Sequence, residues 1–229
     1  MKTLVIITAF NEQENILNTI SDIENHCPDM DYIVINDCSR DDTEKVLREN
    51  DRNFLSLPCN LGIGGGVQTG YRFASENGYD IAIQFDGDGQ HVAKYLGDLI
   101  RPIEAGQADI AIGSRFVKHE GFQSTGLRRF GISFLSKLIN LLCGVKVLDV
   151  TSGMRAVNRH FIEVYAREYA QDYPEPEAII VAAMKGGRIV EVPVEMRERQ
   201  GGTSSINPLR SIYYMIKVSL ALILARFTL

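Results

Sequence analysis

The sequence predicts an α/β fold in which a mostly parallel central sheet has helices on both faces. Short, nearly continuous apolar runs such as TLVIIT (3–8) are typical of strands buried on both faces. Longer stretches of helical character separate these runs, and that alternation indicates βαβ units with right-handed crossovers. The composition, 45% hydrophobic and 23% charged, is that of an ordinary globular chain.

The elements follow from these patterns in order. In the first half we expect strands at 3–8, 31–37, 53–57, 79–85 and 108–114, and helices at 13–25, 41–50, 66–77 and 94–106. In the second half we expect helices at 127–143, 159–169 and 175–185, a strand at 188–196 and a polar, mobile loop at 197–207. Pro193 favours an edge position for that last strand.

Charge and cysteine content argue against several classes of protein. The net charge of −5 is unlike that of a dedicated nucleic-acid binder, because such a protein needs a net cationic face. The four cysteines lie far apart without a C-x-x-C pair, which indicates reduced intracellular thiols rather than a disulfide framework or a zinc site. The first apolar run meets Asn11 and Glu12 too early for a signal peptide, so we expect none.

Four polar clusters directly follow predicted strands. They are AFNE (9–12), NDCSRDDT (36–43), DGDGQ (86–90) and GSR (113–115). Parallel strands end at the same edge of a sheet, and ligands of such sheets bind outside that edge. We therefore expect the four clusters to form one site.

The segment IAIQFDGDGQHV (81–92) places two carboxylates, Asp86 and Asp88, at the mouth of a buried strand. A simple turn is one explanation, because Asp and Gly are favoured turn residues. An EF-hand calcium loop does not fit, because its third ligand position holds Gln90 and no glycine follows. A Mg²⁺ or Mn²⁺ ion shared with the phosphates of a substrate would use both carboxylates, and the place at a strand's carboxyl end favours this hypothesis.

Other common site motifs are missing from the sequence. NLGIGGGVQTG (60–70) fits neither G-x-x-x-x-G-K-[ST] nor G-x-G-x-x-G, which disfavours a P-loop and a Rossmann dinucleotide site. The chain also has no G-x-S-x-G and no H-E-x-x-H, so the sequence does not support a hydrolase or a zinc protease.

The clusters, in this order, resemble the motifs of family-2 glycosyltransferases, which have the GT-A nucleotide-sugar fold. TAFNE is similar to the family's opening motif, NDCSRDDT to its aspartate-rich second motif, and DGDGQH to its D-x-D motif. GSR, the helix with RRFG and SKLIN, DVTSGMRAVNR (149–159) and RQGGTSS (199–205) look like one branch, the polyprenyl-phosphate sugar synthases. That branch includes dolichyl-phosphate mannose synthase and bactoprenol glucosyltransferases. The resemblance covers residues 3–207.

The resemblance implies a role for each matching residue. The nucleoside would be bound by Ala9, Phe10, Asn11, Glu12 and Asp37, with Asn60 and Gly62 lining the same pocket. Asp86, Asp88 and Gln90 would bind the metal, and Asp86, Asp88, Arg115 and Arg199 would act on the phosphates during catalysis. Arg128, Arg129 and Ser133 would bind the acceptor. Asn36 and Cys38 stand where the family often has Asp and Gly, which leaves base specificity open.

The acceptor decides whether a general base is needed. A lipid phosphate is already anionic, whereas a hydroxyl acceptor must lose a proton. Asp149, Glu175 and Glu177 are candidate bases, although YPEPE (173–177) fits a solvated helix start equally well.

The C-terminal stretch 208–229 is largely apolar and interrupted by Lys217 and Arg226. A central lysine costs roughly 2.5–3.5 kcal/mol on insertion scales, which disfavours a spanning helix. We expect an amphipathic helix at the membrane interface, with Lys217 and Arg226 snorkelling and Tyr213 and Tyr214 at headgroup level. A helix that packs in the core or a dimer interface is the alternative.

These features predict a metal-dependent, inverting hexosyltransferase. It would move a hexose or N-acetylhexosamine from a nucleotide-sugar, with UDP favoured, to polyprenyl (undecaprenyl) phosphate for cell-envelope polysaccharide modification. We expect it peripherally at the cytoplasmic face of the membrane, using Mg²⁺ or Mn²⁺, with a small membrane protein or a second copy as partner. Residues 1–207 would form the transferase domain (1–115 for the nucleotide-sugar, 116–207 for the acceptor), and 208–229 the membrane-associating or interface helix.

Three rivals differ in class from this hypothesis. A transferase acting on a polysaccharide hydroxyl would need an essential carboxylate as base. A nucleotidyltransferase would show a glycine- and lysine-rich loop after the first strand, which is missing. A non-catalytic membrane adaptor is disfavoured by the intact Asp86, Asp88 and Gln90.

Overall fold

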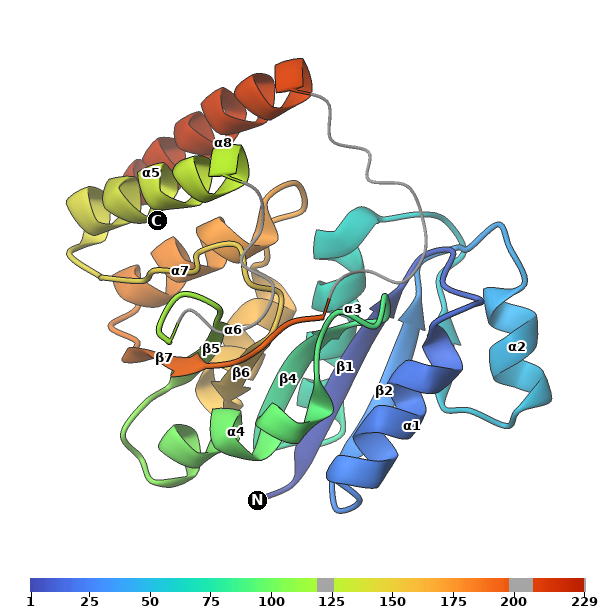
Figure 1. The fold of residues 1–229 in the computed structure, drawn as a ribbon. Helices are drawn as coiled ribbons and strands as arrows, with labels where there is room; N and C mark the ends of the chain where they lie inside the picture. The colour runs from blue at the N-terminus through green and yellow to red at the C-terminus, as the bar shows by residue number, and fades with distance from the viewer. Residues whose placement is uncertain (119–125, 198–207, 229) are drawn as a thin grey trace.

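The computed structural model describes residues 1–118, 126–197 and 208–228 and confirms the predicted architecture, a sheet with helices on both faces (Figure 1). The strands are β1 (Thr3–Ala9), β2 (Asp31–Asn36), β3 (Phe54–Ser56), β4 (Ile81–Asp86), β5 (Ile110–Ser114), β6 (Arg155–Asn158) and β7 (Ile189–Pro193). The helices are α1 (Ile16–His26), α2 (Thr43–Glu49), α3 (Gly62–Glu76), α4 (Leu96–Glu104), α5 (Gly126–Cys143), α6 (Arg159–Arg167), α7 (Pro174–Met184) and α8 (Pro208–Thr228). A short 3₁₀ turn (Ala93–Tyr95) precedes α4.

The strands form one sheet in the order β3-β2-β1-β4-β6-β5-β7. All pairs are parallel except those of β6, which runs antiparallel to β4 and β5. Strand β6 was not predicted from the sequence, because RAVN is only four residues long and half of it is polar. The predicted edge position of the last strand is confirmed, since β7 closes the sheet with Pro193 at its end.

Apolar layers fill both faces of the sheet. Helices α3, α5, α6, α7 and α8 pack on one layer, and α1, α2 and α4 pack on the other (Figure 1). Tyr71 and Phe161 are fully buried in the first layer, and Ile16 and Ile20 in the second. Burying one such side chain contributes about 1.5–3 kcal/mol, so both layers stabilise the sheet that carries the site.

Helix α3 begins at Gly62, four residues before the predicted start. Glycine lowers helix propensity, which is why the pattern GIGGG was not expected to be helical. Packing explains the glycines, because a Cβ at Gly70 would lie 2.1 Å from Ile6 of β1. A Cβ at Gly64 would lie 2.1 Å from the Ala170 carbonyl oxygen. The helix can therefore lie close to the sheet and reach the edge where β1 and β2 end.

Helix α8 packs beside α5 and over α7 (Figure 1), with Val218 and Leu222 fully buried. Lys217 Nζ donates to Asp172 Oδ2 at 3.1 Å, and Arg226 Nε donates to the Leu142 carbonyl at 3.0 Å. Both side chains thus have a partner within the protein, and their snorkelling at a membrane stays a prediction. One face of α8 packs against α5 and α7, which agrees with the predicted alternative of a helix that packs in the core. The side chains of Tyr213 and Tyr214 lie outside the part that is described.

Candidate active site

The four predicted clusters lie at the same edge of the sheet, as expected, because β1, β2, β4 and β5 all run in one direction. The strand order reverses between β1 and β4, where Thr8 pairs with Asp86. A reversal of this kind opens a crevice at the carboxyl ends of the two strands, where ligands of open α/β sheets bind. The antiparallel β6 begins at this edge, so the segment 149–154 before it also reaches the site.

The first two clusters are joined by hydrogen bonds. Asn11 adopts a left-handed backbone (φ 58°), and its Oδ1 accepts from the Arg40 backbone N–H at 2.7 Å. Its own N–H donates to Ser39 Oγ at 3.0 Å. The Glu12 N–H donates to Thr43 Oγ1 at 2.9 Å, and the Glu12 side chain is buried. Residues 9–12 and 36–43 therefore form one wall of the crevice, on which Phe10 is 42% exposed.

Asp37 connects this wall to the head of α3. Its Oδ1 accepts from the Leu61 N–H at 2.7 Å, and its carbonyl accepts from Asn60 Nδ2 at 3.1 Å. Asp37 also donates its backbone N–H to Ala9 at 2.9 Å. Ala9, Asp37 and Asn60 are thus brought together with the start of α3 at Gly62, and their role in binding a nucleoside stays a prediction.

Asn36 explains one departure from the family pattern. Its Nδ2 donates to Ser56 Oγ at 3.0 Å, and its Oδ1 accepts from the Ser39 N–H at 3.2 Å. Ser56 in turn donates its hydroxyl proton to Glu44 at 2.9 Å, so it can only accept from residue 36. An ionised aspartate has no proton to give there, whereas the amide supplies one.

Asp86, Asp88 and Gln90 occupy one turn after β4. The Asp86 side chain is 33% exposed, and Asp88 Oδ1 accepts from the Gln90 N–H at 3.0 Å. Among the described residues no group of three His, Cys, Asp or Glu side chains could hold a metal by itself. Two carboxylates and an amide do fit a Mg²⁺ or Mn²⁺ ion whose remaining ligands come from a substrate and water. Gly153 leaves room at Asp86, because a Cβ there would lie 2.6 Å from Asp86 Oδ2.

His91 lies directly behind this turn and was not predicted to matter. It is 3% exposed, its Nδ1 accepts from the Asp86 N–H at 3.1 Å, and its Nε2 lies 3.5 Å from Asp86 Oδ2. Burial lowers the pKa of His91 to about 4, although Asp88 opposes that shift and Arg115 adds to it. The ring is therefore neutral at pH 7.

Arg115, which was predicted to act on the phosphates, binds Asp149 in the structure, and its phosphate role stays a prediction. Its Nε and Nη2 donate to the two carboxylate oxygens of Asp149, each at 2.7 Å, and the side chains are 7% and 0% exposed. Nη2 also donates to Thr151 Oγ1 at 3.3 Å. Through Asp149 and Thr151 the guanidinium holds the segment before β6. The same pairing buries Asp149, which argues against Asp149 as a general base.

Glu175 reaches the site from the first turn of α7 and is partly buried. Gln84 of β4 lies 3.5 Å from Glu175 Oε1 and accepts from the Tyr169 hydroxyl at 3.1 Å. Arg155, also buried, donates to the Glu175 carbonyl and to carbonyls of the segment before β6. Burial raises the pKa of Glu175; Arg155 opposes the shift and Asp86 adds to it. Burial likewise raises the pKa of Glu177.

The raised pKa of Glu175 predicts a pH-dependent stability. A carboxyl whose pKa is raised by folding stabilises the protein below its unfolded pKa, about 4.3, and this stabilisation is lost as pH rises through the folded pKa. Glu175→Gln does not ionise, so the Tm of the variant minus that of the native chain should be larger at pH 8 than at pH 4. Thermal unfolding at both pH values measures this. Glu163 lies on the exposed surface of α6, so for Glu163→Gln the difference between the Tm of the variant and that of the native chain should be the same at pH 4 and at pH 8.

The predicted acceptor residues lie on α5 or outside the described part. Arg129 and Ser133 are exposed on α5. Arg128 belongs to the first turn of α5, but its side chain is outside the described part. Arg199 is outside it as well, because only Arg197 of the predicted loop at 197–207 is described.

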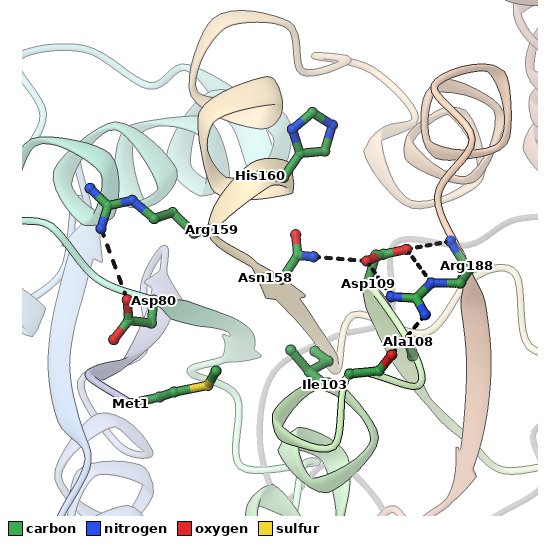
Figure 2. A pocket seen from close by; sticks show the side chains of 10 residues that line it. Met1, Asp80, Ile103, Ala108, Asp109, Asn158, Arg159, His160 and Arg188 are labelled. Atoms are coloured by element: carbon green, nitrogen blue, oxygen red, sulfur yellow. Dashed lines mark hydrogen bonds and ion pairs between the residues drawn. The ribbon is translucent and has the colours of Figure 1, made fainter.

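A second hollow lies at the opposite edge of the sheet (Figure 2). This cavity of about 230 Å³ is lined by residues at the starts of β1, β4, β5 and β7, at the end of β6 and the start of α6, and at the end of α4. Its polar groups bind one another, since Arg188 Nε donates to Asp109 at 2.9 Å and Asn158 Nδ2 donates to the same carboxylate at 2.9 Å. It lacks the two neighbouring carboxylates of the carboxyl edge, which therefore remains the candidate active site.

Comparison with known proteins gives a consistent result. The sequence matches the family model described as "Glycosyl transferase family 2" over residues 4–165. It is 30% identical to the polyprenol monophosphomannose synthase of Mycolicibacterium smegmatis, over 95% of this chain and 86% of that protein. It is 31% identical to the UDP-N-acetylglucosamine–dolichyl-phosphate N-acetylglucosaminyltransferase of Methanococcus voltae, over 83% of this chain and 84% of that protein.

The fold also has a solved counterpart. Glucosyl-3-phosphoglycerate synthase from Mycobacterium tuberculosis, crystallised with Mn²⁺ and UDP-glucose, superposes with a TM-score of 0.73 at 20% identity. The superposition covers 98% of this chain and 78% of the synthase.

Proposed function

The chain belongs to glycosyl transferase family 2, and we propose on that premise that it moves a hexose or an N-acetylhexosamine from a nucleotide-sugar to polyprenyl phosphate. UDP is the proposed nucleotide, and the anomeric carbon is proposed to invert. The observation that carries the proposal is that the hydrogen-bonded residues 9–12 and 36–43 and the turn with Asp86 and Asp88 lie together at the carboxyl ends of the paired strands β1 and β4. The names of the relatives support a polyprenyl-type phosphate as acceptor.

Different groups of residues would bind the nucleoside and the diphosphate of the donor. Phe10, Asn11, Glu12 and Asp37 would hold the nucleoside, and Asp86 and Asp88, with Gln90, would hold a Mg²⁺ or Mn²⁺ ion. When bound, that ion would supply the positive charge that stabilises the departing diphosphate. The solved synthase of similar fold was crystallised with Mn²⁺ and UDP-glucose, which agrees with this assignment.

Transfer to a phosphate needs positioning more than proton removal. An oxygen of the acceptor phosphate forms the new bond to the anomeric carbon as the bond from that carbon to the diphosphate oxygen breaks. The acceptor is anionic, so no base takes part. The exposed Arg129 and Ser133 of α5 would bind it, together with Arg128 and Arg199. Arg115 would act indirectly, by fixing Asp149.

A hydroxyl acceptor is the second candidate, and Glu175 is the specific observation that favours it. This carboxylate is partly buried beside Asp86, and its raised pKa suits a general base. Under this alternative Glu175→Gln would abolish transfer, whereas transfer to a phosphate would persist.

A transfer assay tests the proposal directly. The purified chain would be incubated with polyprenyl phosphate, labelled UDP-glucose, UDP-N-acetylglucosamine, UDP-galactose or GDP-mannose, and Mn²⁺ or Mg²⁺. We expect label in a lipid that releases the sugar on mild acid treatment, loss of that label with EDTA, and its return with added metal. Slow donor hydrolysis without labelled lipid would contradict the acceptor assignment while leaving the donor assignment in place.

The surface formed by α5 and α8 supports a membrane-bound acceptor. Phe130 and Leu141 on α5 are 72% and 81% exposed, and Leu224 and Phe227 on α8 are 63% and 79% exposed. The two helices contain six Lys and Arg and no Asp or Glu. The whole chain has a formal net charge of −5, so the part outside these two helices has a net charge of −11. Within the described residues, no helix has the length and hydropathy needed to cross a bilayer. We propose that this surface lies on an anionic membrane.

The membrane surface makes a prediction of its own. Each basic residue near an anionic bilayer contributes about 1 kcal/mol, so Lys137→Glu on α5 should weaken binding to vesicles that contain anionic lipid. Phe227→Ser should also weaken it through lost apolar burial. Flotation with anionic and zwitterionic vesicles measures both. Lys45→Glu on α2 and Leu55→Ser on β3 alter exposed residues elsewhere and should float like the native chain; equal loss for these controls would contradict the assignment.

A further inference from the structure

His91 is a buried side chain that the proposed transfer mechanism does not use. It is 3% exposed, and its ring packs edge-on against Phe85, with the ring centroids 5.0 Å apart. Buried polar atoms need partners. Each ring nitrogen of His91 faces an atom of Asp86, the first carboxylate of the turn after β4.

The contact at one ring nitrogen fixes the proton on the other. The Asp86 backbone N–H donates to His91 Nδ1 at 3.1 Å, and only an unprotonated nitrogen can accept that bond. The single ring proton therefore sits on Nε2. Nε2 lies 3.5 Å from Asp86 Oδ2, beyond the length of a normal hydrogen bond, so the Nε2 proton and this carboxylate attract each other electrostatically over a longer contact.

Gly153 completes the seat of the same carboxylate. A Cβ at this position would lie 2.6 Å from Asp86 Oδ2 and 3.0 Å from Oδ1. Contacts under 3.0 Å force something to move, and here the atoms that would have to move are those of the Asp86 carboxylate itself. The absence of a side chain at Gly153 is thus a condition for the orientation that Asp86 has.

We infer that His91 is a positioning residue, which orients the Asp86 carboxylate through its Nε2–H while Gly153 keeps the space that the carboxylate occupies. The inference rests on the proposed function, in which Asp86 holds the metal and the diphosphate. An N–H dipole close to a ligating carboxylate favours one orientation of it, and losing such an outer partner typically costs 10- to 100-fold in metal affinity.

Two substitutions separate this role from packing. The amide of His91→Gln stands where Nε2 stands, so it keeps an N–H toward Asp86 Oδ2 but leaves the Asp86 backbone N–H without its acceptor. The carbonyl of His91→Asn stands where Nδ1 stands, so it keeps that acceptor but is too short to reach Oδ2. If His91 has only a structural role, His91→Asn should bind Mn²⁺ at least as tightly as His91→Gln, because it keeps the hydrogen bond from the Asp86 N–H. If His91 positions the carboxylate, His91→Gln should bind Mn²⁺ more tightly than His91→Asn.

The experiment measures Mn²⁺ binding to the purified full chain by electron paramagnetic resonance, with UDP present and no acceptor. We expect His91→Asn and Gly153→Ala to weaken Mn²⁺ binding about 10- to 100-fold, and His91→Gln to weaken it less. Long-range ¹⁵N–¹H spectra of the native chain should show a protonated Nε2 and an unprotonated Nδ1 for His91. Thermal unfolding of each variant identifies any that fail to fold.

Two results would overturn the inference. One is Mn²⁺ binding by His91→Asn that equals or exceeds that of His91→Gln, and the other is a native His91 protonated at Nδ1. Failure of the proposed metal role has a different signature, since the native chain and Asp86→Asn would then show the same Mn²⁺ binding. That result would remove the inference as well, but it would place the error in the function of Asp86 rather than in His91.

Discussion

Asp88→Asn is expected to lower kcat for sugar transfer about 100- to 1,000-fold while leaving the fold intact. Asp88 lies on the turn after β4, and its Oδ1 accepts from the Gln90 N–H at 3.0 Å. Asparagine retains an oxygen for that bond, so the turn should keep its shape. What is lost is the negative charge that the proposed Mg²⁺ or Mn²⁺ ion requires. Steady-state kinetics with Mn²⁺, together with thermal unfolding, measure the two effects separately.

A matched substitution shows whether the charge of Asp88 acts locally. Asp98 on α4 is 48% exposed and pairs with Arg101 at 2.9 Å, a type of surface ion pair that contributes about 0–1 kcal/mol. Asp98→Asn removes one negative charge, as Asp88→Asn does, and should have native activity. Similar activities for the two variants would exclude Asp88 from the metal site.

Asp149→Ala is expected to lower the free energy of unfolding by about 3–5 kcal/mol, the usual cost of removing one partner of a buried ion pair. Asp149 is fully buried and accepts two bonds of 2.7 Å from the Arg115 guanidinium. Without the carboxylate, a buried positive charge loses its counter-charge. For a domain of this size, the loss corresponds to a fall in Tm of roughly 6–20 °C. Urea unfolding and calorimetry measure it.

Two further variants separate the charge from the packing. Arg101→Ala breaks an exposed pair and should change the free energy of unfolding by less than about 1 kcal/mol. Replacing both partners by apolar residues, Arg115→Met with Asp149→Leu, should be far less destabilising than Asp149→Ala, because no charge then stays buried. A large loss of unfolding free energy in this double variant would show that the ion pair stabilises the fold through the geometry of its hydrogen bonds and not only because the two charges neutralise each other.

The sequence predicted the parallel part of the fold because its signals are local. The runs at 3–8 and 31–37 are apolar throughout, as strands covered on both faces must be. Boundaries were less accurate where the backbone turns before a helix. Helix α1 begins at Ile16 rather than 13, because the Glu12 carbonyl accepts from the Asn15 and Ile16 N–H groups in a turn.

The residues that the sequence did not reveal are those whose meaning comes from distant partners. Arg155 and Gln84 lie in buried strands, where polar residues weaken the strand pattern, and they are satisfied by residues 20 and 85 positions away. Gly153 matters through its closeness to Asp86, 67 positions away, whereas His91 lies inside the motif DGDGQH and only the folded turn shows that it contacts Asp86. Arg115 was identified as a site residue, but only the structure shows that its guanidinium binds Asp149.

The place of β6 in the sheet has a consequence for the order in which the chain can assemble. Strands β1 to β4 find all their mutual partners within the first 86 residues. Strand β5 does not, because it pairs with β6 and β7, and both are synthesised later. During translation the apolar run of β5 must therefore wait through about 40 residues, including α5, before β6 inserts between it and β4. An unpaired apolar strand is a template for wrong pairing, so this interval is where the nascent protein is most exposed to aggregation and most dependent on chaperones.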